Sequence, residues 1–359
     1  MEQRYGAVEI MGLKNLVKQI KGQFKKYRFR VAVKNILYHL TTRERRKSFG
    51  SKNPDKTIYI IRSINDKSPF YIGPVHNLLA NYFYVLSHIQ YAKTKGWIPV
   101  VDQLHYPVYN SQKEPVNGTT NPWEYFWQQP GGISLEEAYQ SKNVVLSKQS
   151  WFWQWDMGYD VATYKDSSTV KKYHQLSCDV HFNNATENYV LQAQNTTLPA
   201  TSTLIGVNVR IGGYSAQSKN QGQGHPAQPQ IDQLISIVAS KLGNSRNTQV
   251  FLASDTEFVV NKFRQVFGDK LIVYSRLRTE LGKEFASDSQ KQIYAPGQGY
   301  QTALDYLTEM ELLSHCDSLI GTITSGFRYA LVRNGNCFID LDILDLGKLP
   351  DNKVKEQKK

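Results

Sequence analysis

Hydrophobic runs alternate with segments of helical periodicity along most of this chain. Short runs rich in Val, Ile and Leu, such as "TIYIIR" (57–62) and "LIGVNV" (204–209), are typical of strands buried on both faces. Longer segments, such as 231–243 and 257–268, repeat apolar residues every three or four positions and end at glycine, which predicts helices. This strand–helix–strand order predicts parallel sheets.

The pattern falls into two halves. In the first half, residues 57–63, 97–102 and 143–147 predict strands and residues 76–96 a helix, whereas residues 151–200 are less regular. The second half alternates more cleanly. It predicts strands at 203–210, 248–254, 270–275, 318–321 and 337–341, and helices at 231–243, 257–268, 302–316 and 325–335. We therefore expect an α/β protein with two Rossmann-like domains facing a cleft.

Positive charge is concentrated before the first predicted strand. The net charge is +12, and residues 13–47 hold twelve Lys and Arg against one Glu. Apolar residues recur through this segment at roughly helical spacing, which predicts a basic amphipathic arm over 1–50. Such a helix can lie on an anionic membrane, pack on its own protein, or bind nucleic acid. We expect domains at 51–200 and 201–359 after this arm, and no nucleic-acid partner.

Cysteine use and hydropathy bear on location. Three cysteines form no CxxC pair, and no stretch reaches the ~18 apolar residues of a membrane span. The first residues hold no continuous apolar core of a signal peptide. These features predict a cytoplasmic protein, held at the membrane only through its arm.

Polar residues follow several predicted strands where each one ends. Arg210 ends "LIGVNVR", and its planar fork of donors suits a diphosphate. Gly212 and Gly213 come next and permit a close approach of backbone amides to an anion. The alternative is an arginine paired with a carboxylate between the domains.

A second strand end predicts another anion site. Thr322, Thr324 and Ser325 stand between a short strand and a helix, where free amides suit a phosphate. Ordinary helix capping is the alternative. Asp255 follows "VFLAS" and either caps the next helix or accepts hydrogen bonds from a base or ribose.

Candidate residues for acceptor binding and proton transfer lie in the first half and in the glycine-rich segment 211–229. Asp102 at a strand end and His225 are candidate bases. The tryptophans all lie in the first half, where aromatic faces could stack on sugar rings or could fill the core. Trp123, Trp127 and Trp153 are the candidates for acceptor binding.

Several long segments resemble a known family. "VLSHIQYAKTKGWIPVVD" and "NPWEYFWQQP" in the first half, and "VFLASDTE", "YLTEMELLSHCDSLIGTITSG" and "ALVRNG" in the second, occur in family order. They resemble the bacterial branch of the GDP-fucose-type fucosyltransferases, which is related to the nodulation fucosyltransferase and to the α-1,6- and O-fucosyltransferases. The resemblance covers most of residues 57–345.

The resemblance implies a GT-B-like fold and metal-independent, inverting transfer of a sugar, fucose in that family, from a GDP-sugar. No cofactor is implied, because the GDP-sugar is a substrate. The acceptor would be a hydroxyl of a cell-surface glycan or lipid-linked oligosaccharide. The resemblance places Arg210 where the family's arginine contacts the donor diphosphate, and Asp255, Glu309, Thr324 and Ser325 where the family lines its donor pocket. Asn208, Gly212 and Thr322 complete the candidate donor-binding set.

Two positions depart from the family pattern. Asn208 stands where the family has His, and Gly213 stands where it has Asp. Asparagine can hydrogen-bond a phosphate but cannot act as a base near neutral pH. A degenerate transferase that binds a nucleotide-sugar or glycan without turnover is therefore the alternative function.

Overall fold

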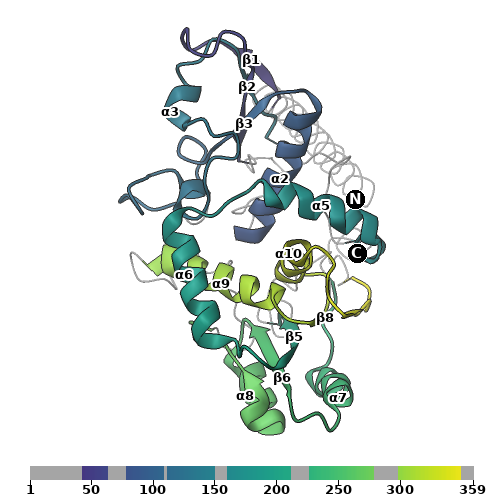
Figure 1. The fold of residues 1–359 in the computed structure, drawn as a ribbon. Helices are drawn as coiled ribbons and strands as arrows, with labels where there is room; N and C mark the ends of the chain where they lie inside the picture. Colours follow the sequence, from purple (N-terminus) through teal and green to yellow (C-terminus); the bar gives the residue numbers. More distant parts are fainter. Residues whose placement is uncertain are drawn as a thin grey trace, which may run out of the picture.

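The structure is a computed structural model that describes residues 43–63, 78–108, 111–149, 160–211, 226–278 and 298–348. It is an α/β fold with two sheets (Figure 1). The first sheet has the order β1-β4-β2-β3, in which β2 pairs in parallel with β3 and β4, and β1 is antiparallel. Its strands are β1 (Arg45–Lys47), β2 (Ile58–Arg62), β3 (Ile98–Asp102) and β4 (Val144–Leu146).

The second sheet is fully parallel and has the order β7-β6-β5-β8-β9. This is the doubly wound order in which the winding direction reverses between β5 and β8. Its strands are β5 (Thr203–Val209), β6 (Thr248–Ser254), β7 (Leu271–Ile272), β8 (Ser318–Gly321) and β9 (Asp340–Ile343).

Helices cover both faces of the second sheet, which explains its continuous apolar strands. Ile205 and Val207 of β5 pack with α7 (Ile231–Leu242) and α8 (Glu257–Phe267). Leu204 packs on the other face with α9 (Gln298–Ser314) and α10 (Ser325–Asn334). Asn208 shares the face of Leu204 because side chains alternate along a strand.

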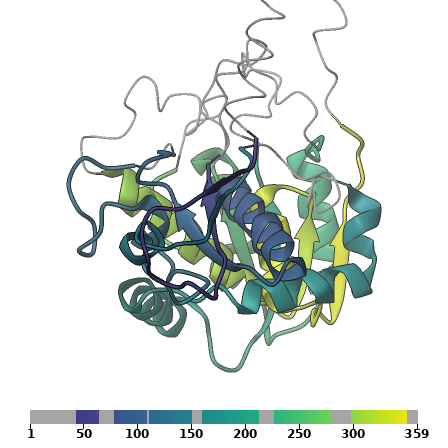
Figure 2. The ribbon, with the colours of Figure 1, turned by 90° about the horizontal axis from the view of Figure 1, so that it is seen from above.

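The less regular region between the halves contains three helices, α4 (Val161–Lys165), α5 (Ser167–Cys178) and α6 (Asn184–Thr197). Each starts at a side-chain cap, which is Asp160, Asp166 and Asn183 in turn. α5 packs on α10 and α6 packs on α9. In Figure 2 these teal helices run along the lower edge of the molecule.

One continuous core joins the two halves. The helix α2 (Leu78–Thr94) is almost fully buried over its first three turns and contacts both α9 and α10. The ring of Tyr82 in α2 lies 5.1 Å from that of Tyr329 in α10. The loop between α6 and β5 coincides with the predicted division near residue 200, but α5 and α6 bridge the division by packing on the second half.

Some predicted elements differ from those observed. Residues 45–47 form β1 of the first sheet, so the end of the predicted helical arm is wrong; residues 1–42 lie outside the described residues. Strand β7 is shorter than predicted, and β9 begins three residues later. No helix in the described ranges is long and apolar enough to cross a membrane.

Candidate functional site

The carboxyl ends of β5 and β8 form the centre of the candidate site, because ligands of doubly wound sheets bind where the winding reverses. Asn208 in β5 is 6% exposed, and its Oδ1 accepts a hydrogen bond from Thr324 Oγ1 at 2.8 Å. The two strand ends are also joined through Gln228, whose Nε2 donates to Thr322 Oγ1 at 2.7 Å. The Gln228 Oε1 accepts from the backbone amide of Arg210 at 3.4 Å.

The first turn of α10 lies directly after β8. Thr324 is its N-cap, and its Oγ1 accepts from the backbone amide of Phe327 at 3.2 Å. Thr322 and Ser325 are buried with it. The capping interpretation is therefore confirmed for Thr324, while an anion at this helix start remains a prediction.

Asp255 joins the ends of β5 and β6. Its Oδ1 accepts from the backbone amide of Ile211 at 3.1 Å. Thr256, not Asp255, is the N-cap of α8, so the capping alternative for Asp255 is wrong. The carboxylate instead lies beside the residue that follows Arg210.

Two arginines after β7 enclose Glu309 of α9. Arg276 Nη2 lies 2.7 Å from Glu309 Oε2, and Arg278 Nη2 donates to Glu309 Oε1 at 3.0 Å. All three side chains are at most 5% exposed. Glu309, predicted to line the donor pocket, is thus committed to these guanidinium groups and can act on a ligand only through them.

This buried triad carries one positive charge in excess. Burial opposes the charge of Arg276, but the Glu309 carboxylate raises its pKa overall. Burial lowers the pKa of Arg278, although Glu309 opposes the shift. Both guanidinium groups stay protonated near neutral pH, because an arginine titrates far above that range.

Arg328 adds another buried guanidinium at the start of α10. It is 3% exposed and lies 4.5 Å from the ring centre of Phe83 in α2. Its Nη2 donates to Ser325 Oγ and its Nη1 to Tyr164 Oη. Arg276, Arg278 and Arg328 are not among the site residues predicted from the sequence. A local signal existed for the first two, which follow a strand as Arg210 does.

The carboxyl edge of the first sheet holds a different group of polar residues. Asp102, predicted as a base, is fully buried at the end of β3. Its Oδ1 accepts from the backbone amide of His105 at 2.9 Å, and its Oδ2 accepts from Tyr139 Oη at 2.6 Å and faces His105 Nδ1 at 3.0 Å. A carboxylate so enclosed has no free approach for a substrate hydroxyl, so Asp102 as the direct base is wrong.

The two carboxyl edges are linked by the chain that follows β3. Asn117 Nδ2 donates to Tyr300 Oη at 3.0 Å, and a Cβ added to Gly299 would lie 2.8 Å from Gln112 Nε2. Tyr300 and Gly299 belong to the first turn of α9. Because α9 leads from β7 back to β8, that turn lies on the carboxyl side of the second sheet.

The predicted acceptor tryptophans are core residues. Trp123 and Trp127 are 0% and 2% exposed, and their rings pack on each other with centres 4.5 Å apart. Tyr82 packs against both. Acceptor binding by these two residues is therefore wrong. Trp153, His225, Gly212 and Gly213 lie outside the described residues.

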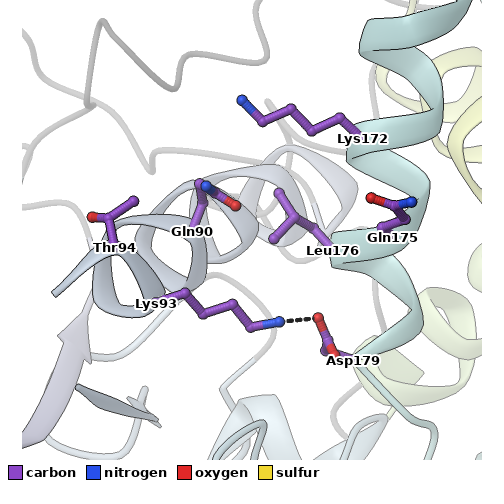
Figure 3. A pocket seen from close by; sticks show the side chains of 7 residues that line it. All are labelled: Gln90, Lys93, Thr94, Lys172, Gln175, Leu176 and Asp179. Atoms are coloured by element: carbon purple, nitrogen blue, oxygen red, sulfur yellow. Dashed lines mark hydrogen bonds and ion pairs between the residues drawn. The ribbon is translucent and has the colours of Figure 1, made fainter. Parts of the chain in front are cut away.

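A hollow between α2 and α5 lies away from these edges. Figure 3 shows it lined by polar side chains and Leu176, with an ion pair between Lys93 and Asp179. It adjoins the last turn of α2, which leads into the amino end of β3. The hollow is thus on the side of the first sheet opposite to Asp102. Within the described ranges, no three His, Cys, Asp or Glu residues are grouped to hold a metal ion.

The chain matches no family model and no curated protein. Among solved structures it is similar to NodZ α-1,6-fucosyltransferase soaked with GDP-fucose, at 14% identity over 77% of this chain and 93% of that one, with a TM-score of 0.41. It is also similar to Arabidopsis thaliana FUT1 in complex with GDP, at 12% identity, 83% and 71% coverage and a TM-score of 0.46. POFUT1 in complex with GDP matches at 12% identity, 82% and 99% coverage and a TM-score of 0.41. These similarities are distant, and no residue role is taken from them.

Proposed function

We propose that this chain is a glycosyltransferase that moves a sugar, fucose, from a GDP-sugar to a hydroxyl of a glycan or lipid-linked oligosaccharide. The observation that carries the proposal is the excess of buried arginine at the carboxyl edge of the second sheet. Arg276 and Arg278 flank the buried carboxylate of Glu309, and Asp255 also acts on Arg276. Arg328 and Arg210 stand at neighbouring element ends, so arginines outnumber carboxylates here. Such an environment favours an anion with several charges.

A diphosphate leaving group fits this environment. As the bond to the sugar breaks, negative charge grows on the β-phosphate oxygen, and fixed guanidinium groups stabilise it without reorganising. The amino end of α10 adds the positive end of a helix dipole. Arg210 is proposed to contact the diphosphate directly, and Glu309 to hold Arg276 and Arg278 in place. This stabilisation requires no metal ion.

Guanine as the base and fucose as the sugar rest on the sequence motifs described above. Inversion is proposed on the same ground and requires the acceptor hydroxyl to approach the sugar from the side opposite the diphosphate. The acceptor would then approach from the first sheet. The basic segment 13–47 is proposed to hold the enzyme on the cytoplasmic face of an anionic membrane.

A nucleotide panel tests the donor class. Full-length protein is titrated with GDP, GDP-fucose, GDP-mannose, UDP and CMP, and binding is followed by thermal shift, since a ligand that binds the native state raises the melting temperature. We expect GDP and GDP-fucose to raise the melting temperature and UDP and CMP to leave it unchanged. Equal shifts with UDP would overturn the assignment of a GDP-sugar.

The alternative is a degenerate transferase, and Asn208 favours it. This residue replaces a family histidine, and its amide is engaged by Thr324 Oγ1 and lies 3.8 Å from Met310 Sδ. A protein that binds GDP but releases none from GDP-fucose, with water or any oligosaccharide as acceptor, would establish this alternative. Release of GDP with formation of a fucosylated product would exclude it.

A further inference from the structure

We infer that His105 is the general base that removes the proton from the acceptor hydroxyl, and that Asp102 is the residue that positions it. The inference rests on the proposed function. It arises from one contrast at the end of β3, where the His105 side chain is 56% exposed and the Asp102 side chain beside it is 0% exposed. The imidazole ring of His105 is thus open to solvent, while the carboxylate that contacts it is buried.

The hydrogen bonds orient the imidazole. Asp102 Oδ2 lies 3.0 Å from His105 Nδ1, and a buried carboxylate is an acceptor, so the ring proton belongs on Nδ1. The lone pair is then on Nε2, at the exposed side of the ring. The second bond, from the His105 backbone amide to Asp102 Oδ1 at 2.9 Å, fixes the backbone as well as the ring.

Tyr139 supports the carboxylate without competing for the imidazole. Its hydroxyl donates to Asp102 Oδ2 at 2.6 Å, and its ring lies 5.0 Å from that of His105 in an edge-on arrangement. Burial, followed by the bond to Asp102, raises the pKa of Tyr139, so the phenol keeps its proton and remains a donor.

Arg62 lies beside Asp102 in the sheet and does not form an ion pair with its carboxylate. Arg62 and Asp102 are register partners on β2 and β3, yet no ion pair joins them in the described part of the chain. The Arg62 guanidinium turns instead to the backbone carbonyl oxygens of Ser147 and Arg43 and lies 5.5 Å from the ring centre of Tyr106. The carboxylate charge therefore remains available to stabilise an imidazolium at His105.

The location suits an acceptor-side base. His105 begins the segment that continues to Gln112 and Asn117, which touch the first turn of α9 on the carboxyl side of the second sheet. The base and the proposed diphosphate site thus belong to opposite sheets. This arrangement is compatible with inverting displacement, in which the hydroxyl attacks from the side opposite the leaving group.

His105 Nε2 takes the proton of the acceptor hydroxyl while its oxygen bonds to the anomeric carbon of fucose. The bond from that carbon to the β-phosphate oxygen breaks, and its electron pair leaves with GDP. The imidazolium then returns its proton to water.

His105→Ala tests the inference by chemical rescue. Release of GDP from GDP-fucose is measured with a panel of free oligosaccharides and with water. We expect kcat to fall about 100- to 10,000-fold, since a general base contributes about that factor, while the Kd for GDP is unchanged. Added imidazole should restore at least a tenth of the lost rate, which a residue with only a structural role would not allow.

Three further variants complete the test. Asp102→Asn should lower kcat with little change in the Kd for GDP, and Tyr139→Phe should change kcat less, because the bond between His105 and Asp102 persists. His315→Ala, at an exposed histidine beyond α9, should leave kcat unchanged. The melting temperature of each variant establishes that it is folded.

Three outcomes overturn the inference. They are unchanged kcat in His105→Ala, loss of kcat in this variant without rescue by imidazole, and absence of any GDP release by the wild-type protein. In the last case, retained GDP affinity would preserve the proposed donor site as that of a degenerate transferase. Absence of GDP binding by the wild-type protein in the nucleotide panel would instead overturn the proposed function itself.

Discussion

The carboxyl edges of the two sheets differ in what they bury. At the second sheet, Arg276 and Arg278 are sealed around Glu309 with one positive charge in excess. At the first sheet the carboxylate of Asp102 is sealed, and His105 above it is open to solvent. Buried fixed cations suit the binding of an anion, whereas an exposed imidazole on a buried carboxylate suits the exchange of a proton. In the proposed function, charge stabilisation and proton removal therefore belong to separate sheets.

The largest effect should come from breaking the buried triad. Glu309→Gln keeps the side-chain volume but removes the buried carboxylate that directly contacts both guanidinium groups. We expect the free energy of unfolding to fall by about 3–5 kcal/mol, measured by urea denaturation. Asp305→Asn, one turn earlier on α9 and bound to Tyr189 Oη at 2.8 Å, is the matched control and should change it far less. An unaltered Glu309→Gln protein would show that the triad contributes little to stability.

A smaller effect should follow from a methyl group at Gly321, the last residue of β8. An added Cβ would lie 2.7 Å from the backbone oxygen of Asn208 and 2.9 Å from Phe327 Cδ2. Gly321→Ala should separate the ends of β5 and β8, destabilise the protein by about 1–3 kcal/mol and weaken GDP binding. Gly299→Ala meets only the end of the flexible Gln112 side chain and should be tolerated. Equal stability and equal GDP affinity of the two variants would contradict the close packing of β5 and β8 at Gly321.

The dependence of stability on pH should reveal the buried His88 of α2. Burial lowers the pKa of His88 well below its usual range, and Lys148 and Arg62 add to the shift. In the unfolded chain His88 binds a proton as the pH falls through about 6.5, whereas in the folded chain it stays neutral. The free energy of unfolding therefore falls as the pH drops below about 6.5. The slope due to His88 is at most about 1.4 kcal/mol per pH unit.

His88→Gln removes this titration. Its free energy of unfolding, measured in urea between about pH 7 and pH 5, should depend less steeply on pH than that of the wild type. The same slope in both proteins would mean that His88 does not contribute to the acid sensitivity.

The smallest effect is expected at the hollow between α2 and α5. Lys93 and Asp179 are 45% and 42% exposed, so their ion pair is screened by solvent. Lys93→Ala should change the free energy of unfolding by at most about 1 kcal/mol and leave GDP affinity intact. Loss of GDP binding in this variant would indicate that GDP binds in the hollow and not at the strand ends.

The sequence predicts most of the second sheet because its strands are continuous apolar runs. Strands β6 and β8 begin and end where the pattern predicts. Helices α5 and α6 were missed, since they are rich in Ser, Thr, Asn and Gln and bury few residues. Their caps at Asp166 and Asn183 were the available signal. The strand β9 begins later than predicted because the Cys337 amide donates to Asn334 Oδ1 and extends the turn after α10.

The site was only partly predictable for a physical reason. Arg210, Asp255 and Thr322 follow strands directly, so local order places them at one edge. The contacts of Glu309 depend on how α9 packs against β5 and β6 and on where the chain runs after β7, which no local pattern encodes. Composition likewise could not separate a tryptophan in the core from one on a surface, as Trp123 and Trp127 show.

The most direct test of the central claim is the affinity for GDP of Arg210→Ala, measured by titration calorimetry. Each charge-assisted hydrogen bond contributes about 1.5–3 kcal/mol, so Kd should rise roughly 10- to 100-fold. Affinity for GMP, which lacks the β-phosphate, should change less. Arg264→Ala, at an arginine that is 57% exposed on α8, is the matched control and should leave both affinities unaltered. Wild-type affinity for GDP in Arg210→Ala would contradict a diphosphate site at this strand end.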